Sequence, residues 1–330
     1  MKVSWQIVRF NLKEIFSISY GNYSYRDALI ITLTQNGFSG YGECTAIDYY
    51  HINLQEYDKK LHLIKQQLEK QKNLLPIHFY TYLETLNLPS FLRSALDCAY
   101  WDLFGKLENK SFLELNNIQI NNLPESSITI SVAPIDLQIE KIQKSKWNNF
   151  KVKCNGFDKD FIEKLATLNK NIALDSNGSF TKQDCEFLEN NFVSSKFSYI
   201  EQPMKMDGFQ SLNCNKFANW MADEDCKNVS ELIILQPHYK SVNVKLLKSG
   251  GLTPSLALIK EAKKLNFKIM IGCMTESTIG ISAASVLAPL VDYVDLDGAN
   301  LIANDIANGT KIVNGKINLS EKPGLGISIL

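Results

Sequence analysis

The sequence of 330 residues has little arginine and histidine and no long apolar run. Arg9, Arg26 and Arg93 are its three arginines, so few groups can bind an anion through two parallel hydrogen bonds. No apolar run approaches the roughly 20 residues that a membrane helix needs. The formal net charge is zero and no block of like charge occurs, so neither nucleic acid nor a membrane surface is expected as a partner.

The seven cysteines are scattered along the chain and none stands in a Cys-x-x-Cys pair. An odd number of cysteines without paired spacing is typical of reduced thiols, so neither a disulfide framework nor a zinc site is expected. The four histidines show no ligand spacing either. The first residues enter an alternating pattern without the apolar core of a signal peptide, and we expect a cytoplasmic protein.

The N-terminal part of the chain predicts an α+β domain over residues 1–122. Residues 3–14, 25–35 and 39–44 alternate between apolar and polar side chains, which predicts an antiparallel three-stranded sheet. Asn36-Gly37 is a hairpin turn signal between the second and third strands. Loops are expected at 17–24 and 49–53. Apolar residues at helical spacing then predict helices over 54–72, 76–86 and 89–107.

From residue 127 short apolar strands alternate with helical segments. Eight strands are predicted, at 128–132, 150–154, 172–175, 199–201, 220–223, 242–246, 269–273 and 293–297. This alternation favours a (β/α) barrel over residues 123–310. A doubly wound sheet is the alternative, but it needs a Gly-rich phosphate turn after its first strand, where Val132-Ala133-Pro134 stands. Residues 311–330 lack a helical pattern and are expected to return to the first domain.

Lys151 and Lys153 are two residues apart on a predicted strand, so their side chains share one face. Repulsion between the two ammonium groups and burial both lower a lysine pKa toward the range in which the amine acts as a base. A Lys-x-Lys pair by itself is more typical of a solvated polar face. The functional interpretation depends on acidic residues at the next three strand ends and on Lys245 at the sixth.

Three carboxylates stand at consecutive strand ends. They are Asp175, Glu201 and Asp223, 26 and 22 residues apart, and such ends converge on the mouth of a barrel, where catalysis takes place. A single carboxylate at such a place is more often a helix N-cap. Three together repel one another unless a cation lies between them, and hard oxygen ligands select Mg²⁺. We therefore predict a magnesium site at these three residues.

Lys153 and Lys245 would then flank the metal from opposite sides of the barrel. This arrangement suits removal of a proton from one face of a carbon α to a bound carboxylate and return of a proton to the other face. Two opposed bases predict an epimerase or racemase. With a single acting base, the same site would support a β-elimination or a cycloisomerisation.

Five motifs at the predicted strand ends carry a family resemblance: Lys151-x-Lys153, Asp175-x-Asn177, Glu201-Gln202-Pro203, Asp223-Glu224 and Lys245-x-x-Lys248-x-Gly250-Gly251. Together they resemble the enolase superfamily, specifically its muconate-lactonizing-enzyme subgroup, over essentially the whole chain. The resemblance implies a modified TIM barrel with an α+β capping domain that the C-terminal segment completes. It also implies that the three carboxylates bind Mg²⁺ and that Lys153 and Lys245 exchange the proton. Lys151 would lower the pKa of Lys153.

Asp295-Leu296-Asp297 on the eighth strand resembles the Asp-x-Asp motif of dipeptide epimerases, in which the pair binds the free α-ammonium of a dipeptide. Two carboxylates on one face of a strand attract a cation, which agrees with that role. The alternative is that Asp297 caps the following turn while Asp295 points outward. Thr129 and Thr275, near the first and seventh strand ends, are further candidates to line a dipeptide site.

The predicted function is a Mg-dependent dipeptide epimerase that inverts the α-carbon of the C-terminal residue through an enediolate. The leading substrate is L-Ala-L/D-Glu, with hydrophobic dipeptides next. In L-Ala-D/L-Glu epimerases a basic residue in the loop after the first strand meets the glutamate side chain; here Gly21 stands at that place, and Arg26 is the nearby arginine. Arg26 as an exposed strand residue, or a pocket lined by Tyr20, Tyr23 and Tyr25, are alternatives. The second candidate function is an o-succinylbenzoate synthase or muconate-type cycloisomerase, and a homo-oligomer is left open.

Overall fold

The first three strands form an antiparallel sheet in the computed structural model, which describes residues 1–330. They are β1 (Lys2–Ile18), β2 (Gly21–Gln35) and β3 (Phe38–Thr45), paired in the order β1-β2-β3. Asn36 and Gly37 join β2 to β3, and both have positive φ, as an Asn-Gly hairpin turn requires. The predicted antiparallel sheet is confirmed.

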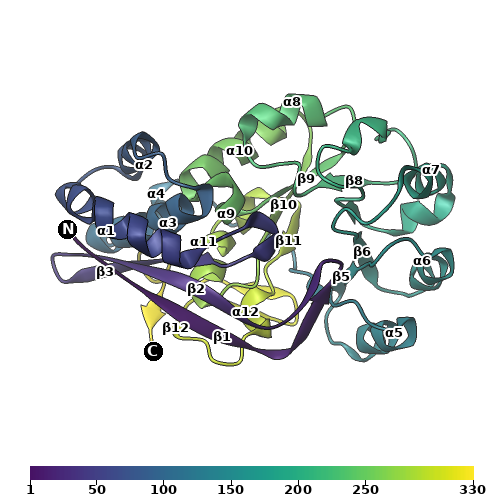
Figure 1. The fold of residues 1–330 in the computed structure, drawn as a ribbon, viewed down its shortest axis with the longest axis horizontal. Coiled ribbons are helices and arrows are strands. Elements are labelled where there is room, and N and C mark those ends of the chain that lie inside the picture. The colour runs from purple at the N-terminus through teal and green to yellow at the C-terminus, as the bar shows by residue number, and fades with distance from the viewer.

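The hairpin of β1 and β2 is longer than the sequence predicts. The loop expected over residues 17–24 is wrong, because the two strands continue to a two-residue turn at Ser19-Tyr20. A bulge before Phe16 shifts the register, and pairing resumes with Phe16 opposite Tyr23. Aromatic and β-branched side chains on both strands favour this extension. The hairpin therefore reaches from the N-terminal sheet across to the parallel strands of the second sheet (Figure 1).

Four helices follow the sheet: α1 (Leu54–Lys70), α2 (Pro76–Thr85), α3 (Ser90–Glu108) and α4 (Phe112–Leu115). The segment expected as a loop at 49–53 begins instead with a 3-10 helix at Asp48–Tyr50. Helix α3 lies directly against β3. At Gly42 of β3 an added Cβ would stand 1.9 Å from the carbonyl oxygen of Ala95, so glycine is what allows this close contact.

Eight parallel strands form the second sheet. They are β4 (Ile128–Ile130), β5 (Asn149–Lys153), β6 (Asn171–Asp175), β7 (Ile200–Glu201), β8 (Trp220–Ala222), β9 (Ser241–Val244), β10 (Lys268–Gly272) and β11 (Tyr293–Asp295). They neighbour one another in sequence order, so no switch point of a doubly wound sheet exists. A parallel bridge between Ser126 and Val294 joins the last strand to the first and nearly closes the barrel. The predicted barrel is confirmed.

The connections between these strands cover the outside of the barrel (Figure 1). They contain α5 (Ile135–Lys144), α6 (Lys159–Ala166), α7 (Lys182–Asn190), α8 (Leu232–Leu235), α9 (Leu246–Ser249), α10 (Leu252–Lys264) and α11 (Thr278–Ser285), and α12 (Gly298–Leu301) follows the last strand. Helix α6 begins where Asp158 accepts a hydrogen bond from the Phe161 amide at 3.0 Å, and it buries Phe161, Ile162 and Leu165. None of the helices is long and apolar enough to span a membrane.

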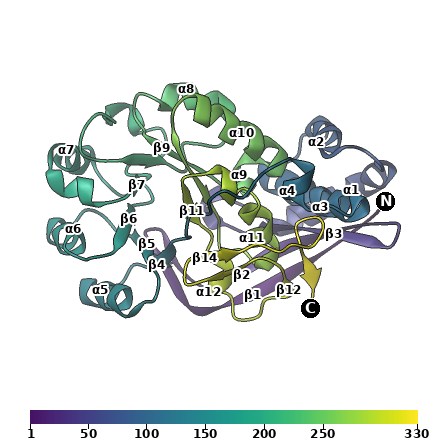
Figure 2. The ribbon, with the colours of Figure 1, turned by 180° about the vertical axis from the view of Figure 1, so that it is seen from behind.

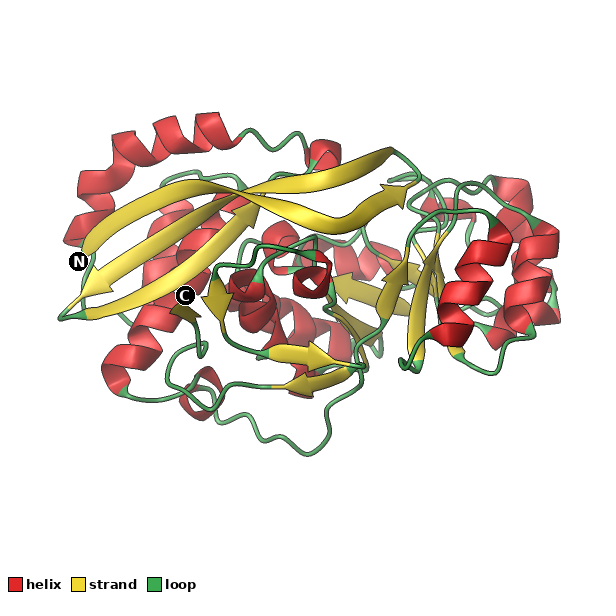
Figure 3. Cartoon of the chain, turned by 90° about the horizontal axis from the view of Figure 1, so that it is seen from below, coloured by secondary structure: helices red, strands yellow, loops and turns green.

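The C-terminal segment contacts the N-terminal helices. It forms two small pairs, β12 (Ala307–Asn308) with β15 (Ser328–Ile329) and β13 (Lys311–Val313) with β14 (Lys316–Asn318). Near its end, the Leu325 amide donates to Asp102 of α3 at 2.8 Å, and Lys106 of α3 donates to the Ile327 carbonyl at 2.8 Å. Figures 2 and 3 show this segment beside the N-terminal sheet and helices.

Candidate active site

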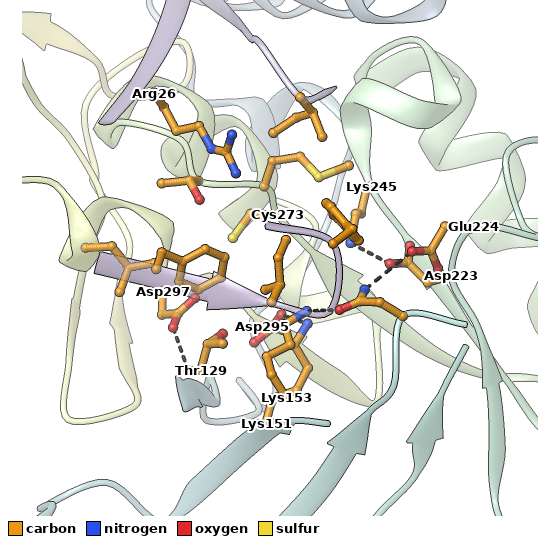
Figure 4. Close-up of a pocket in the computed structure, with 18 of the residues that line it drawn as sticks. Arg26, Thr129, Lys151, Lys153, Asp223, Glu224, Lys245, Cys273, Asp295 and Asp297 are labelled. Atoms are coloured by element: carbon orange, nitrogen blue, oxygen red, sulfur yellow. Dashed lines mark hydrogen bonds and ion pairs between the residues drawn. The ribbon is translucent and has the colours of Figure 1, made fainter. Parts of the chain in front are cut away.

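A pocket lies where the N-terminal hairpin meets the mouth of the barrel (Figure 4). The N-terminal part contributes Phe16, Ile18, Tyr20, Arg26, Ile47 and Tyr50 to its wall. The barrel contributes Thr129, Lys151, Lys153, Asn177, Asp223, Glu224, Lys245, Cys273, Met274, Thr275, Asp295, Asp297 and Leu301. The sequence-predicted mouth residues therefore gather in one place, and the apolar side chains of the hairpin cover them.

Lys153 and Lys245 face this pocket from opposite sides of the barrel. Lys153 ends β5 and Lys245 follows β9, four strands further along the sheet. The Lys153 ammonium donates to Asp175 Oδ2 at 2.5 Å and to Asn177 Oδ1 at 3.1 Å, and Lys245 donates to Asp223 Oδ2 at 2.6 Å. Burial is the largest single effect on Lys245 and disfavours its charge, but Asp223, Glu201 and Glu224 together outweigh burial and raise the pKa of Lys245 above its ordinary value.

Lys151 is buried at the centre of an ionic network. Its ammonium pairs with Asp295 and lies 3.3 Å from Glu201 Oε2 and 3.7 Å from Asp175 Oδ2. Burial disfavours the charged form, but these carboxylates outweigh it and raise the pKa of Lys151 well above its usual value. Burial and a neighbouring ammonium group each lower a lysine pKa, but at Lys151 the carboxylates of three other strands act in the opposite direction and prevail.

The three predicted metal ligands are neighbours at the ends of β6, β7 and β8. Asp175 and Glu201 are directly paired in the parallel register, and Asp223 follows the last residue of β8. Their exposed fractions are 0%, 0% and 1%. In this arrangement no three potential ligands surround a common point, and each of these carboxylates lies beside a lysine instead.

The donor set nevertheless fits a hard divalent cation. Three buried carboxylates on adjacent strands supply the oxygen ligands that Mg²⁺ prefers. Glu201 accepts a hydrogen bond from Asn243 at 2.6 Å through Oε1, whereas its buried Oε2 accepts no hydrogen bond and has the Lys151 ammonium beside it at 3.3 Å. Burial is the largest effect on Glu201 and raises its pKa to about 7, although the Lys151 ammonium opposes it. A bound cation would satisfy both the free oxygen and the charge.

Asp295 and Asp297 both lie inside the barrel, but they differ in their partners. Asp295 accepts a hydrogen bond from Ser127 Oγ at 2.6 Å through one oxygen and pairs with Lys151 through the other. Asp297 accepts a hydrogen bond from the Thr129 amide at 2.6 Å. Burial and, as the next largest effect, the negative charge of Asp295 raise the pKa of Asp297 to about 6. The alternative that Asp297 caps the next turn does not hold for its side chain, which makes no capping hydrogen bond to α12.

Arg26 is buried, contrary to its interpretation as an exposed strand residue. Its exposed fraction is 5%, its guanidinium lies 3.5 Å from the centre of the Tyr23 ring, and its Nε has no hydrogen-bond partner. Arg9, by comparison, forms a two-bond pair with Asp27, whereas Arg26 forms no ion pair. Figure 4 shows Arg26 reaching from the N-terminal sheet toward the residues of the barrel.

The two threonines lie on the wall of the pocket. Thr129 is in β4, beside Asp297, and Thr275 follows β10, where its carbonyl accepts a hydrogen bond from Thr45 of β3 at 3.3 Å. Tyr20 also lines the pocket, but Tyr23 and Tyr25 do not. The structure thus brings every predicted site residue to the mouth or to the ionic network directly below it.

Sequence reasoning missed two contributions to the pocket. Glu224 was not among the predicted site residues, but it lines the pocket, and burial together with Asp223 raises its pKa to about 8. The apolar wall formed by Phe16 and Ile18 was missed because the hairpin tip was interpreted as a loop. Period-two alternation through residues 16–20 (Phe-Ser-Ile-Ser-Tyr) was the signal that could have revealed it.

Comparisons with known proteins agree on one family. Residues 137–330 match the family described as enolase C-terminal domain-like. The chain is 34% identical to an L-Ala-D/L-amino acid epimerase of Maribacter sp., covering 100% of this chain and 99% of the relative. It is 36% identical to an L-Ala-D/L-amino acid epimerase of Flavobacterium johnsoniae, covering 100% of both. A dipeptide epimerase from Methylococcus capsulatus, solved with Mg and L-Arg-D-Lys, has a TM-score of 0.89 at 25% identity and 99% coverage of both chains.

Proposed function

Since the chain belongs to the enolase superfamily and is an epimerase-type isomerase, we propose that it inverts the α-carbon of the C-terminal residue of a dipeptide, with L-Ala-L-Glu and L-Ala-D-Glu as the leading pair. One observation carries the proposal: Lys153 and Lys245 face a single pocket from β5 and from the end of β9, with buried carboxylates between them.

In this proposal the two lysines exchange the proton across the substrate. For one isomer, Lys153 takes the α-proton as a neutral amine and Lys245 returns a proton to the opposite face as an ammonium; for the other isomer the roles are reversed. Lys151, kept charged by the surrounding carboxylates, disfavours a second positive charge on Lys153. Asp175, Glu201 and Asp223 would hold Mg²⁺. That ion would stabilise the negative charge that develops on the substrate carboxylate.

The other end of the substrate would bind at the eighth strand. A dipeptide carries a free α-ammonium, and the buried carboxylates of Asp295 and Asp297 supply negative charge on that side of the pocket. Thr129 and Thr275 would line the peptide between this end and the lysines. This arrangement supports a dipeptide over substrates without an ammonium group, such as those of an o-succinylbenzoate synthase or a muconate-type cycloisomerase, because two acids would repel them.

The preference for an acidic side chain rests on Arg26. A buried guanidinium without an ion pair is costly, and an anion from the substrate would compensate it. The glutamate carboxylate of the leading substrate is such an anion. The apolar neighbours Phe16, Ile18 and Ile47 would pack on the aliphatic part of a side chain, which keeps hydrophobic dipeptides as the second substrate class.

The proposal is tested by proton exchange in D₂O. The protein is incubated with Mg²⁺ and a set of L,L-dipeptides, and the products are followed by mass spectrometry and chiral chromatography. Incorporation of one deuterium at the C-terminal residue together with appearance of the L,D isomer is expected, most rapidly for L-Ala-L-Glu. The absence of exchange with every dipeptide, alongside turnover of a muconate-type acid, would transfer the assignment to the cycloisomerase.

A further inference from the structure

Lys248 is a buried lysine that the proposed reaction does not use. It lies in α9, one turn after Lys245, and its side chain is 1% exposed. Lys245 lines the pocket, whereas Lys248 does not. A buried ammonium is retained only where its partners compensate the loss of water, so the contacts of Lys248 indicate its role.

The Lys248 ammonium is fully occupied by acceptors of the protein. It donates to Asp223 Oδ1 at 2.5 Å, to the Cys226 carbonyl at 3.0 Å and to the Asn243 carbonyl at 3.1 Å, and it also contacts the Asp223 carbonyl. An ammonium has three donors, so none is left for a substrate. Lys248 therefore cannot be a third acid or base of the pocket.

These contacts hold Asp223 from below. Lys248 donates a hydrogen bond to Oδ1 of Asp223, and Lys245, which lines the pocket at the mouth, donates to Oδ2. The same ammonium bridges the backbone of the loop after β8 to Asn243 of β9, so that the carboxylate and its loop are tied to the neighbouring strand. Residues that orient a metal ligand in this way affect metal affinity without contacting the metal.

The position of Lys248 is itself fixed by the Gly250-Gly251 turn. Both glycines have positive φ, at 97° and 130°. A Cβ at Gly251 would stand 2.4 Å from Asp97 Oδ2 of α3, so the turn fits closely against the N-terminal helices. The turn ends α9 after a single turn of helix, and Lys248 in that turn lies within hydrogen-bond distance of Asp223, which follows β8.

We propose that Lys248 is a positioning residue that orients the Asp223 carboxylate for a divalent cation. The inference rests on the proposed function in one respect, namely that Asp223 is a metal ligand. It adds a residue that neither touches the substrate nor exchanges a proton, but on which the metal affinity of the site depends.

The test measures Mg²⁺ binding to the protein without substrate, by isothermal titration calorimetry. Lys248→Met keeps the length and apolar stem of the side chain but removes the donors, and we expect Mg²⁺ to bind roughly 10–100-fold more weakly. Epimerisation by this variant should recover partly as the Mg²⁺ concentration is raised, because the lysines of the pocket are intact.

Lys106→Met is the matched control. Lys106 also donates to one carboxylate, Asp102 at 2.7 Å, and to two carbonyls, of Ser39 and Ile327 at 2.8 Å each, but it lies away from the mouth. We expect this variant to bind Mg²⁺ like the wild-type protein. Equal Mg²⁺ affinity in Lys248→Met and the wild type, or an equal loss in both variants, would overturn the positioning role.

Two further variants keep the outcome decisive. If circular dichroism shows that Lys248→Met is unfolded, Lys248→Arg is measured instead. This variant retains the charge but not the tetrahedral set of donors, so its Mg²⁺ affinity should still fall. An unchanged affinity would contradict the proposal. Asp223→Asn separates the two hypotheses. If the wild-type affinity survives this change, Asp223 is not a metal ligand, and the proposed magnesium site fails together with the role of Lys248.

Discussion

At the scale of single residues, the chemistry of the site depends on which carboxylate each lysine meets. Lys151, Lys153 and Lys245 are all lysines within the barrel, but Lys151 pairs with Asp295, Lys153 with Asp175 and Lys245 with Asp223. The first of these pairs joins β5 to β11. All three lysines line the pocket, and Lys153 and Lys245 do so from opposite sides, where a substrate can compete for their carboxylates.

The first prediction concerns the two pocket lysines. Lys153→Ala and Lys245→Ala should each lower epimerisation by at least about 10²-fold, because a positioned acid or base contributes this much or more. Each variant should still exchange the α-proton of one dipeptide isomer with D₂O, and the two variants should differ in which isomer exchanges. The measurement is deuterium incorporation into each purified isomer. Full epimerisation by either variant would contradict the two-base mechanism.

The second prediction concerns the side-chain preference. Arg26→Met removes the buried guanidinium, so KM for L-Ala-L-Glu should rise more than tenfold while KM for a neutral dipeptide such as L-Ala-L-Met changes little. Steady-state kinetics on both substrates check this. Arg9→Met is the control, since Arg9 lies on the same sheet but is 56% exposed and pairs with Asp27. Equal effects of Arg26→Met on both dipeptides would remove Arg26 from the specificity site.

At the scale of elements, the β1–β2 hairpin and the β3–α3 contact place the N-terminal part over the barrel. The hairpin tip brings apolar side chains over the lysines, which excludes water from the pocket and strengthens electrostatic interactions inside it. Helix α3 anchors this arrangement, because it contacts β3 on one side and α9 on another. The position of the hairpin is thus coupled to the element that carries Lys248.

The third prediction tests the β3–α3 contact. In Gly42→Ala the new methyl group would meet the Ala95 carbonyl oxygen, and the strand and helix would have to separate. We expect the free energy of unfolding to fall by about 1–3 kcal/mol, as in other overpacked contacts. Chemical denaturation monitored by circular dichroism measures the change. A variant as stable as the wild type would contradict this prediction, because β3 and α3 would then separate without a fall in the free energy of unfolding.

At the scale of the whole molecule, a buried carboxylate joins the N-terminal sheet to the barrel. Glu43 of β3 accepts hydrogen bonds from the Ser277 amide at 3.0 Å, the Ser277 hydroxyl at 2.5 Å and the Gly280 amide at 3.1 Å, at the start of α11. Glu276 and Asp305 are the acidic groups that face it. Burial is the largest effect on Glu43 and raises its pKa to about 7, although the hydrogen bonds oppose it.

The fourth prediction follows from the sign of this shift. Because the pKa of Glu43 is raised in the folded protein, the folded state binds more protons than the unfolded state between about pH 4.5 and pH 7. Protonated Glu43 therefore stabilises the folded protein at low pH. Raising the pH through the range in which Glu43 loses its proton should reduce the free energy of unfolding by on the order of 2–3 kcal/mol. Denaturation at pH 5 and pH 8 measures the difference.

Glu43→Gln should lose part of this pH dependence, because the amide oxygen can still accept hydrogen bonds but carries no charge. Glu84→Gln, at an exposed position of α2, should leave the dependence unchanged. If wild type and Glu43→Gln lose the same stability between the two pH values, the dependence arises from other buried acids such as Asp97, whose pKa burial also raises to about 7.

Much of this protein was predictable from local pattern. The eight barrel strands and the order of acidic and basic strand ends follow from the alternation of short apolar segments, because strand ends of a sequential parallel barrel must meet at one mouth. Asp175, Glu201, Asp223, Lys153 and Lys245 could be proposed in this way before any coordinates. Their chemical roles and the boundaries at residues 122 and 310 remain predictions.

The tertiary structure decided what depends on contacts between distant segments. Residues 20 to more than 100 positions away along the chain decide three features of the site. They decide which carboxylate neutralises Lys151, whether Arg26 is exposed or buried, and that Lys248 holds Asp223. Charge and burial act through space and cannot be assigned from spacing along one strand. The sequence by itself determined the barrel and the order of the charged residues at its strand ends, and only the folded chain determined how these residues are paired and what else lines the pocket.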